Sequence, residues 1–143
     1  PNKYIQIENG GLTTTYADTN LRIQPIKTAE IKLSDAWWSS EYNLKQENKR
    51  AEIFKQSDGF TSFITLLYFP DKTNLQYEKI PVYDRADVLL KDTDVEAVNL
   101  YLDGKTYTLV IVHNSPAPAA NFFKVNGQIV NGEVVLIEKN ENN

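Results

Sequence analysis

Residues 95–112 read VEAVNLYLDGKTYTLVIV, and this stretch decides the fold class. Two runs rich in Val, Leu, Tyr and Thr, 95–102 and 105–112, flank the dipeptide Asp103-Gly104. A tight type I′ turn needs positive φ at both central residues, and Asp-Gly adopts that conformation at little cost. The stretch therefore predicts an antiparallel β-hairpin.

Similar short segments, rich in Val, Ile, Thr, Tyr and Phe, recur along the rest of the chain without a sustained helical stripe. Further strands are expected near residues 4–7, 12–16, 21–26, 30–33, 37–42, 50–56, 60–69, 75–80, 87–90, 122–125 and 133–138. Asn126-Gly127 and Asn131-Gly132 repeat the turn signal, and the proline-containing residues 115–120 predict a loop, because proline cannot join a β-ladder. The pattern predicts an all-β protein, an antiparallel two-sheet β-sandwich.

The segment 60–69 is apolar on both of its alternating sides. One side includes Phe63 and Leu67, and the other includes Ile64 and Leu66. A strand with two apolar faces is typical of the middle of a covered sheet. We therefore expect residues 60–69 to form a central strand.

The composition indicates one folded domain over residues 1–143, with 41% hydrophobic and 24% charged residues. No apolar run approaches the ~18 residues of a membrane-spanning helix. A net charge of -4 disfavours a nucleic-acid partner, because phosphate backbones bind basic surfaces. The absence of cysteine excludes disulfides and thiolate metal sites. The chain starts at Pro1 without methionine, so we expect a piece of a longer precursor.

Few residues are candidates for catalysis. His113 is the only histidine and follows a predicted strand, where a lone imidazole is expected to be a surface or hydrogen-bonded residue. Ser39 and Ser115 lack the G-x-S-x-G context of a nucleophile elbow. No catalytic residue and no cofactor is therefore expected.

An acidic run lies between residues 84 and 96. It consists of Asp84, Asp87, Asp92, Asp94 and Glu96. Calcium binds several carboxylate oxygens, but this spacing lacks the glycine and glutamate positions of an EF-hand loop. Solvated turns are the preferred interpretation, and no metal site is expected.

The paired tryptophans Trp37 and Trp38 are the most informative aromatic residues. Successive side chains of a strand point to opposite faces, so one indole is expected to enter the core and the other to face outward. Trp38 and Tyr42 would then share an outer face on which sugar rings can stack. Lys45 and Arg50 could meet an acidic polymer beside it. The alternatives are that both indoles are packed and that the charged residues solvate an edge.

Three stretches, 35–45 (DAWWSSEYNLK), 50–54 (RAEIF) and 63–70 (FITLLYFP), resemble the C-terminal β-domain of heparinase II/III-type polysaccharide lyases. The shared patterns are W-x-S-x-x-Y and T-L-L-Y-x-P. Residues 11–16 (GLTTTY) and 20–25 (NLRIQP) also look like that family. The resemblance covers mainly residues 11 to 70.

The resemblance implies a parent protein with an α-helical toroid followed by β-sandwich layers, periplasmic or secreted, that cleaves uronate-containing polysaccharides by β-elimination. In the family, the catalytic Tyr, His and Asn or Arg residues come mostly from preceding segments, and none of those motifs can be matched here. The implied role is a non-catalytic C-terminal β-sandwich. Its partners would be the catalytic domain of the same parent chain and an acidic polysaccharide, and this β-sandwich could form one wall of the cleft.

The resemblance also aligns Trp37 with the family's recurring tryptophan. We therefore expect Trp37 to be a structural residue, buried beside the strand that carries Phe63 and Leu67, with the Tyr42 hydroxyl fixing the end of its own strand. Trp37→Ala would then cost about 3 to 5 kcal/mol.

Two alternative functions remain open. A free-standing carbohydrate-binding module would expose an aromatic strip around Trp37, Trp38 and Tyr42. A protein-interaction or adhesin sandwich would instead present a polar sheet face without such a strip and would pair through an edge strand.

Overall fold

The computed structural model describes residues 4–114 and 122–140. Within these ranges the regular elements are all strands, and they form four antiparallel sheets. The predicted all-β antiparallel class is confirmed, and the sheets are compatible with a β-sandwich. None of the described residues belongs to a helix that is long and apolar enough to cross a lipid bilayer.

The chain forms two compact units. The N-terminal unit comprises Pro1–Gly59 and Phe63–Phe69, and the C-terminal unit comprises Phe60–Ser62 and Pro70–Asn143. The organisation as one domain stays a prediction.

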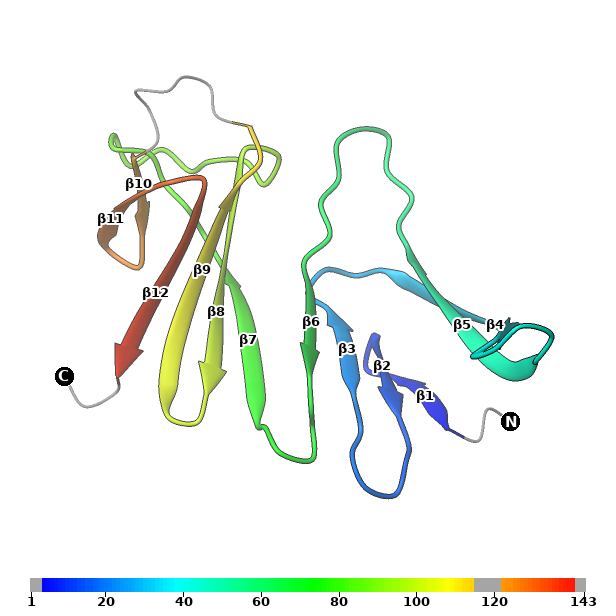
Figure 1. Ribbon diagram of the computed structural model, residues 1–143. Coiled ribbons are helices and arrows are strands. Elements are labelled where there is room, and N and C mark those ends of the chain that lie inside the picture. The colour runs from blue at the N-terminus through cyan, green and yellow to red at the C-terminus, as the bar shows by residue number, and fades with distance from the viewer. Residues whose placement is uncertain (1–3, 115–121, 141–143) are drawn as a thin grey trace. The chain divides into compact units, whose positions relative to one another are not determined.

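The N-terminal unit contains a four-stranded sheet in the order β1-β2-β3-β6 (Figure 1). Its strands are β1 (Ile5–Glu8), β2 (Gly11–Thr14), β3 (Arg22–Pro25) and β6 (Thr65–Tyr68). Asn9 and Gly10 connect β1 to β2 with φ values of 47° and 68°, the left-handed geometry of a type I′ turn. This Asn-Gly turn follows the same rule as Asp103-Gly104, although it was not predicted from the sequence.

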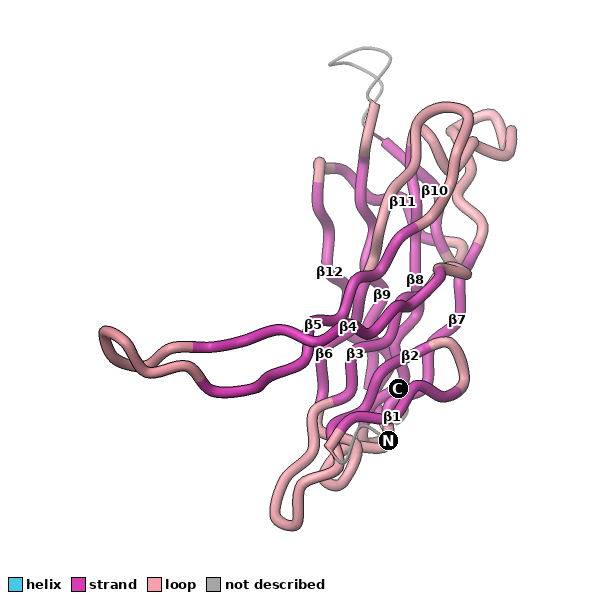
Figure 2. The backbone as a smooth tube through the Cα atoms, turned by 90° about the vertical axis from the view of Figure 1, so that its right-hand side faces the viewer, coloured by secondary structure: helices cyan, strands magenta, loops and turns pink. Residues whose placement is uncertain are grey.

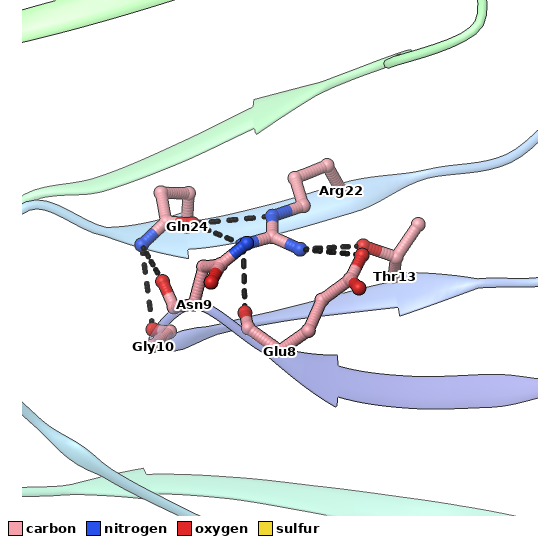
Figure 3. A network of polar contacts seen from close by, with 6 residues as sticks. All are labelled: Glu8, Asn9, Gly10, Thr13, Arg22 and Gln24. Atoms are coloured by element: carbon pink, nitrogen blue, oxygen red, sulfur yellow. Dashed lines mark hydrogen bonds and ion pairs between the residues drawn. The ribbon is translucent and has the colours of Figure 1, made fainter.

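A buried guanidinium group connects the first three strands of this sheet (Figure 3). Arg22 Nη2 donates to the Glu8 carbonyl oxygen at 2.9 Å, and Nη1 donates to the Thr13 hydroxyl at 2.8 Å. Gln24 Oε1 accepts from Arg22 Nε at 3.1 Å and from Nη2 at 2.6 Å. A side chain on Gly11 would clash with both Arg22 and Gln24. The network therefore has a structural role, since a buried charge needs this many partners.

A separate hairpin consists of β4 (Glu30–Trp38) and β5 (Gln46–Phe54). Its register is uninterrupted from Glu30↔Phe54 to Trp38↔Gln46, and Figure 2 shows the two strands continuing into the loop at their tip. The expected strands 30–33 and 37–42 are thus one strand that ends at Trp38. β4 and β5 pair only with each other among the described strands.

The C-terminal unit contains a second four-stranded sheet, in the order β12-β9-β8-β7 (Figure 1). Its strands are β7 (Leu75–Ile80), β8 (Val95–Leu102), β9 (Lys105–Val112) and β12 (Val134–Asn140). Asp103 and Gly104 turn β8 into β9 with φ values of 51° and 73°, which confirms the predicted hairpin. β8 and β9 match their predicted ranges residue for residue.

The core of this unit lies between that sheet and a small hairpin of β10 (Phe122–Val125) and β11 (Gln128–Asn131). It consists of Ile80, Val82, Val95, Ala97, Val110, Phe123 and Val125. Asn126 and Gly127 form the β10–β11 turn, with φ values of 49° and 75°, as their sequence predicts. Asn131-Gly132 does not form a tight hairpin, because Asn131 belongs to β11 and only Gly132, at 138°, has positive φ.

Two other strand predictions are wrong. Instead of a central strand over 60–69, only Thr65–Tyr68 forms a strand, and β6 ends its sheet order. Phe63 is 50% exposed and Leu67 is 64% exposed, because pairing with β3 alone does not cover two apolar faces. The expected strand 87–90 is reduced to an isolated bridge between Tyr83 and Leu89. The predicted loop 115–120 lies outside the described residues.

Candidate functional site

The β4–β5 hairpin and the tip that connects its strands carry all four residues predicted to bind a substrate. Trp37 is 54% exposed and Trp38 is 53% exposed, and as neighbours in a regular strand they point to opposite faces. The prediction that Trp37 is buried is therefore wrong. Strand alternation separates the two faces correctly, but β4 has only β5 beside it, and neither face of the hairpin buries its indole.

The other residues predicted to pack with Trp37 are also exposed rather than buried. Tyr42 lies in the hairpin tip and is 95% exposed, so its hydroxyl does not fix a buried strand end. Leu67 lies in β6 and Phe63 lies just before it, and both side chains are exposed, as both indoles are. The assignment of Trp37, Phe63 and Leu67 to one packed core cluster does not hold.

The part of the hairpin around Trp37, between Asp35 and Lys49, forms one wall of a groove of about 950 Å³, here called the aromatic groove. Its lining residues are Tyr4, Ile5, Tyr16, Asp35, Ala36, Trp37, Lys45, Gln46, Glu47, Asn48 and Lys49. All of them belong to the N-terminal unit. The groove combines half-exposed aromatic rings with carboxylates, amides and amines.

Two tyrosines form the second aromatic element of the groove. The rings of Tyr4 and Tyr16 are stacked, with centroids 5.4 Å apart and planes 14° from parallel. Tyr4 is placed by the β1–β2 hairpin, whose ladder continues with a hydrogen bond from Thr15 N to the Tyr4 carbonyl oxygen at 2.9 Å. The Asn20 side chain holds the Tyr16 backbone with two hydrogen bonds. Asn20 Nδ2 donates to the Tyr16 carbonyl oxygen at 3.1 Å, and the Tyr16 backbone N–H donates to Asn20 Oδ1.

Charged groups surround the Trp37 ring. The Lys45 ammonium group lies over the ring in a cation–π contact, and Glu47 is the cross-strand neighbour of Trp37. Asp35 forms an ion pair with Lys49, its own cross-strand neighbour. The hydrogen bond from Lys49, and then its positive charge, hold the pKa of Asp35 below the ordinary aspartate value. Asp35 is thereby kept as a hydrogen-bond acceptor rather than a proton donor.

This arrangement is suited to binding a polar ligand with flat apolar faces. Aromatic rings supply large contact areas, and the surrounding amides, carboxylates and amines supply directional hydrogen bonds. A sugar ring has both properties, since its C–H groups form apolar faces and its hydroxyl groups lie at the rim. The groove can therefore contact a flat apolar ring face while its polar groups hydrogen-bond to groups at the rim.

The structure separates the four residues predicted to bind substrate. Lys45 lines the aromatic groove, but it contacts Trp37 rather than Trp38. Trp38 and Arg50 lie on the face of the hairpin opposite to Trp37. Side chains alternate between the two faces along each strand, and the cross-strand pairs Trp38↔Gln46 and Ser34↔Arg50 are an odd number of positions from the pair Trp37↔Glu47. Tyr42 belongs to neither face, since β4 ends before it.

Tyr4 and Tyr16 are not among the site residues predicted from the sequence. A signal for them was present, because Asn9-Gly10 fixes the register of β1 against β2, with Ile5 opposite Thr14. Extending that register brings Tyr4 close to Tyr16. Recognising this hairpin would have revealed the aromatic pair.

A second polar cluster lies in the C-terminal unit around Glu96. This carboxylate is 1% exposed within β8 rather than in a solvated turn, which corrects part of the prediction for the acidic run. Glu96 Oε2 accepts a hydrogen bond from the Ser62 hydroxyl at 2.5 Å and lies 2.9 Å from His113 Nε2. The Phe60 ring packs on His113, with centroids 5.4 Å apart. His113 is thus a hydrogen-bonded residue, as its position predicts.

The geometry of this cluster does not match a hydrolytic triad. Ser62 and His113 both bind the same oxygen of Glu96, whereas a triad needs the imidazole between the hydroxyl and the carboxylate. The cluster instead anchors residues 60–62 to β8.

The remaining acidic residues have structural partners. Asp84 accepts from the backbone N–H groups of Ala86 and Val88, and Lys124 pairs with Asp87. Among residues 4–114 and 122–140, no three histidine or acidic side chains gather in a way that could hold a metal ion.

Comparisons of the chain with known protein families, with characterised proteins and with solved structures gave no match. The similarity to heparinase II/III-type lyases stays a prediction from the quoted motifs.

Proposed function

We propose that this chain is a non-catalytic β-domain that binds a carbohydrate polymer through the aromatic groove. The observation that carries this proposal is the half-exposed Trp37 ring, placed in one groove with the stacked Tyr4 and Tyr16. Large aromatic rings left open to solvent beside amides and charged groups are typical of a ligand site rather than of a core.

The polymer that we propose is an acidic, uronate-containing polysaccharide, and the chain would be the C-terminal part of a heparinase II/III-like lyase, periplasmic or secreted. Lys45 and Lys49 supply ammonium groups for uronate carboxylates, although Asp35 and Glu47 offset them. The W-x-S-x-x-Y and T-L-L-Y-x-P motifs support the link to lyases. The lyase chemistry would lie in the catalytic domain of the parent chain, and this chain alone would be inactive.

The exposed aromatic residues also bear on the two alternatives. They fit a free-standing carbohydrate-binding module equally well, since a module and an attached domain can bind glycan through the same groove. They disfavour the adhesin alternative, which expects a polar sheet face without an aromatic strip.

Affinity gel electrophoresis tests the binding proposal, with alginate, heparan sulfate and chondroitin as probes and laminarin as the uncharged polymer. We expect retention by at least one uronate polymer. Trp37→Ala and Tyr16→Ala should each weaken it about tenfold or more, because each removes an aromatic contact surface. Tyr42→Ala is the control, since Tyr42 lies outside the groove.

Failure of all four polymers to retain the chain, or equal binding by Trp37→Ala and the wild type, would contradict carbohydrate binding through this groove. The link to lyases has its own test. A parent protein should release products with a 4,5-unsaturated uronate, which absorbs in the ultraviolet, and the isolated chain should release none.

A further inference from the structure

The Lys45 side chain lies across the aromatic ring on which the proposed function depends. Its ammonium group contacts the Trp37 indole in a cation–π interaction, and Lys45 itself lines the aromatic groove. Glu47 is the direct cross-strand neighbour of Trp37, so Lys45, just before β5, is a diagonal neighbour on the same face. A long side chain in that position can reach an aromatic ring. One side of the indole is therefore covered by a cation of the protein itself.

The two lysines of the groove differ in their partners. Lys49 forms an ion pair with Asp35 across the two strands. The contact of Lys45 is with an uncharged ring, and Lys45 belongs to the exposed tip of the hairpin. An exposed cation–π contact is weak, and a lysine ammonium group on its flexible stem can move to a stronger partner. Of the two lysines, Lys45 is therefore the one that a ligand displaces more easily.

We propose that Lys45 is a displaceable cover on Trp37 that selects uronate polymers over neutral glycans. This inference rests on the proposed function and names the residue that sets its specificity. A uronate ring carries a carboxylate, so the Lys45 ammonium group exchanges the indole for a charge-assisted hydrogen bond with the ligand. A neutral glucan must displace the same cation without offering it a charged partner, and this cost lowers its affinity.

A cover differs from a lysine that only attracts an acidic polymer. A purely electrostatic partner strengthens the binding of uronate polymers and leaves the binding of neutral glycans unchanged. A cover also weakens the binding of neutral glycans, because it competes with them for the ring. Removal of the Lys45 side chain should therefore change the two affinities in opposite directions.

Affinity gel electrophoresis of Lys45→Ala tests this inference, with laminarin as the neutral polymer and alginate, heparan sulfate and chondroitin as the uronate polymers. The affinity for laminarin should rise about two- to fivefold, the change that corresponds to the loss of an exposed cation–π contact. The affinity for each uronate polymer that retains the wild type should fall about threefold or more, because the charged partner of the carboxylate is lost.

Lys32→Ala is the matched control. It removes the same charge from β4, but Lys32 is not one of the residues that line the groove. Both affinities should therefore change less than about twofold in this variant.

The cover can also be measured without a glycan. The chain contains two tryptophans, so Trp37 is the only indole in a Trp38→Phe background. Adding Lys45→Ala to that background should increase the constant for fluorescence quenching by acrylamide, a neutral quencher, because the ring becomes more accessible. Adding Lys32→Ala should leave the constant unchanged.

Laminarin binding that Lys45→Ala leaves unchanged or weakens would overturn the cover and leave carbohydrate binding through the groove intact. A quenching constant that Lys45→Ala leaves unchanged would overturn it as well, whatever the glycan results. Absence of retention by every polymer, in both the wild type and Lys45→Ala, would instead overturn the proposed function and this inference with it. Circular dichroism of each variant checks that the strands are retained.

Discussion

β8 and β4 are both long antiparallel strands, yet one is buried on both faces and the other on neither. In β8, the consecutive residues from Val95 to Asn99 are all buried. In β4, none of the residues from Glu30 to Trp38 is buried. β8 lies between β7 and β9 and under the β10–β11 hairpin, whereas β4 has only β5. The same strand chemistry therefore serves stability in one place and presents aromatic side chains in the other.

The largest expected effect comes from placing the same charge in the two strands. Ala97→Asp in β8 puts a carboxylate at a site with 0% exposure and should cost more than about 4 kcal/mol. Ala36→Asp in β4 should cost less than about 1 kcal/mol, since a partly exposed carboxylate stays hydrated. Urea denaturation of the two variants measures the difference. Similar losses would contradict the assignment of β8 to the core and β4 to the surface.

A second comparison concerns aromatic residues. Phe123 is buried in the C-terminal core, and Phe123→Ala should cost about 3 to 5 kcal/mol through lost burial and a cavity. Trp37→Ala should cost less than about 1.5 kcal/mol, because its ring is already half exposed. Thermal melts can rank the two. A loss for Trp37→Ala as large as that for Phe123→Ala would restore the buried position that the motif alignment predicts.

A third comparison concerns two serine hydroxyl groups. Ser62→Ala removes a donor to the buried Glu96 carboxylate and should cost about 1.5 to 3 kcal/mol, the range for hydrogen bonds to charged groups. Ser39→Ala removes a bond from its hydroxyl to the Glu41 carbonyl oxygen in the exposed tip and should cost less than about 0.5 kcal/mol. Hydrogen exchange near residues 60–62 should accelerate only in Ser62→Ala. Unchanged exchange there would mean that Glu96 does not anchor this segment.

The sequence predicted local structure better than it predicted burial. The β8–β9 hairpin was placed residue for residue, because Asp103-Gly104 fixes its turn and both flanking runs are unambiguous. Trp37 and Leu67 were assigned to a core, and both are exposed. Alternation determines which side chains share a face, but a second layer must be present to bury that face, and its presence depends on contacts distant in sequence.

The candidate site shows the same limit. Trp38, Lys45 and Arg50 are exposed, and their role in binding a substrate stays a prediction, but their division between two faces required the register of β4 with β5. Tyr4 and Tyr16 were missed because their stacking depends on a turn at Asn9-Gly10 and on a loop held by Asn20. The residue types predicted which chemical groups the site contains. Which of these residues lie next to one another depends on how the strands pair.

The smallest expected effect is a titration that reports on the hairpin without unfolding it. Lys49 holds the pKa of Asp35 below its ordinary value, so Lys49→Gln should raise that pKa toward the ordinary value. A depressed carboxyl pKa favours the folded hairpin above the unfolded-state pKa, and this contribution disappears as the pH falls through the lower, folded-state value. Carboxyl chemical shifts of Asp35 recorded against pH by NMR measure the change. Lys105→Gln is the matched control, because it breaks the corresponding pair with Glu138 between β9 and β12 and should leave Asp35 unchanged. If Asp35 in the wild type has its ordinary pKa, the Asp35–Lys49 ion pair between β4 and β5 does not form in solution. The two strands that form one wall of the aromatic groove would then lack this cross-strand contact.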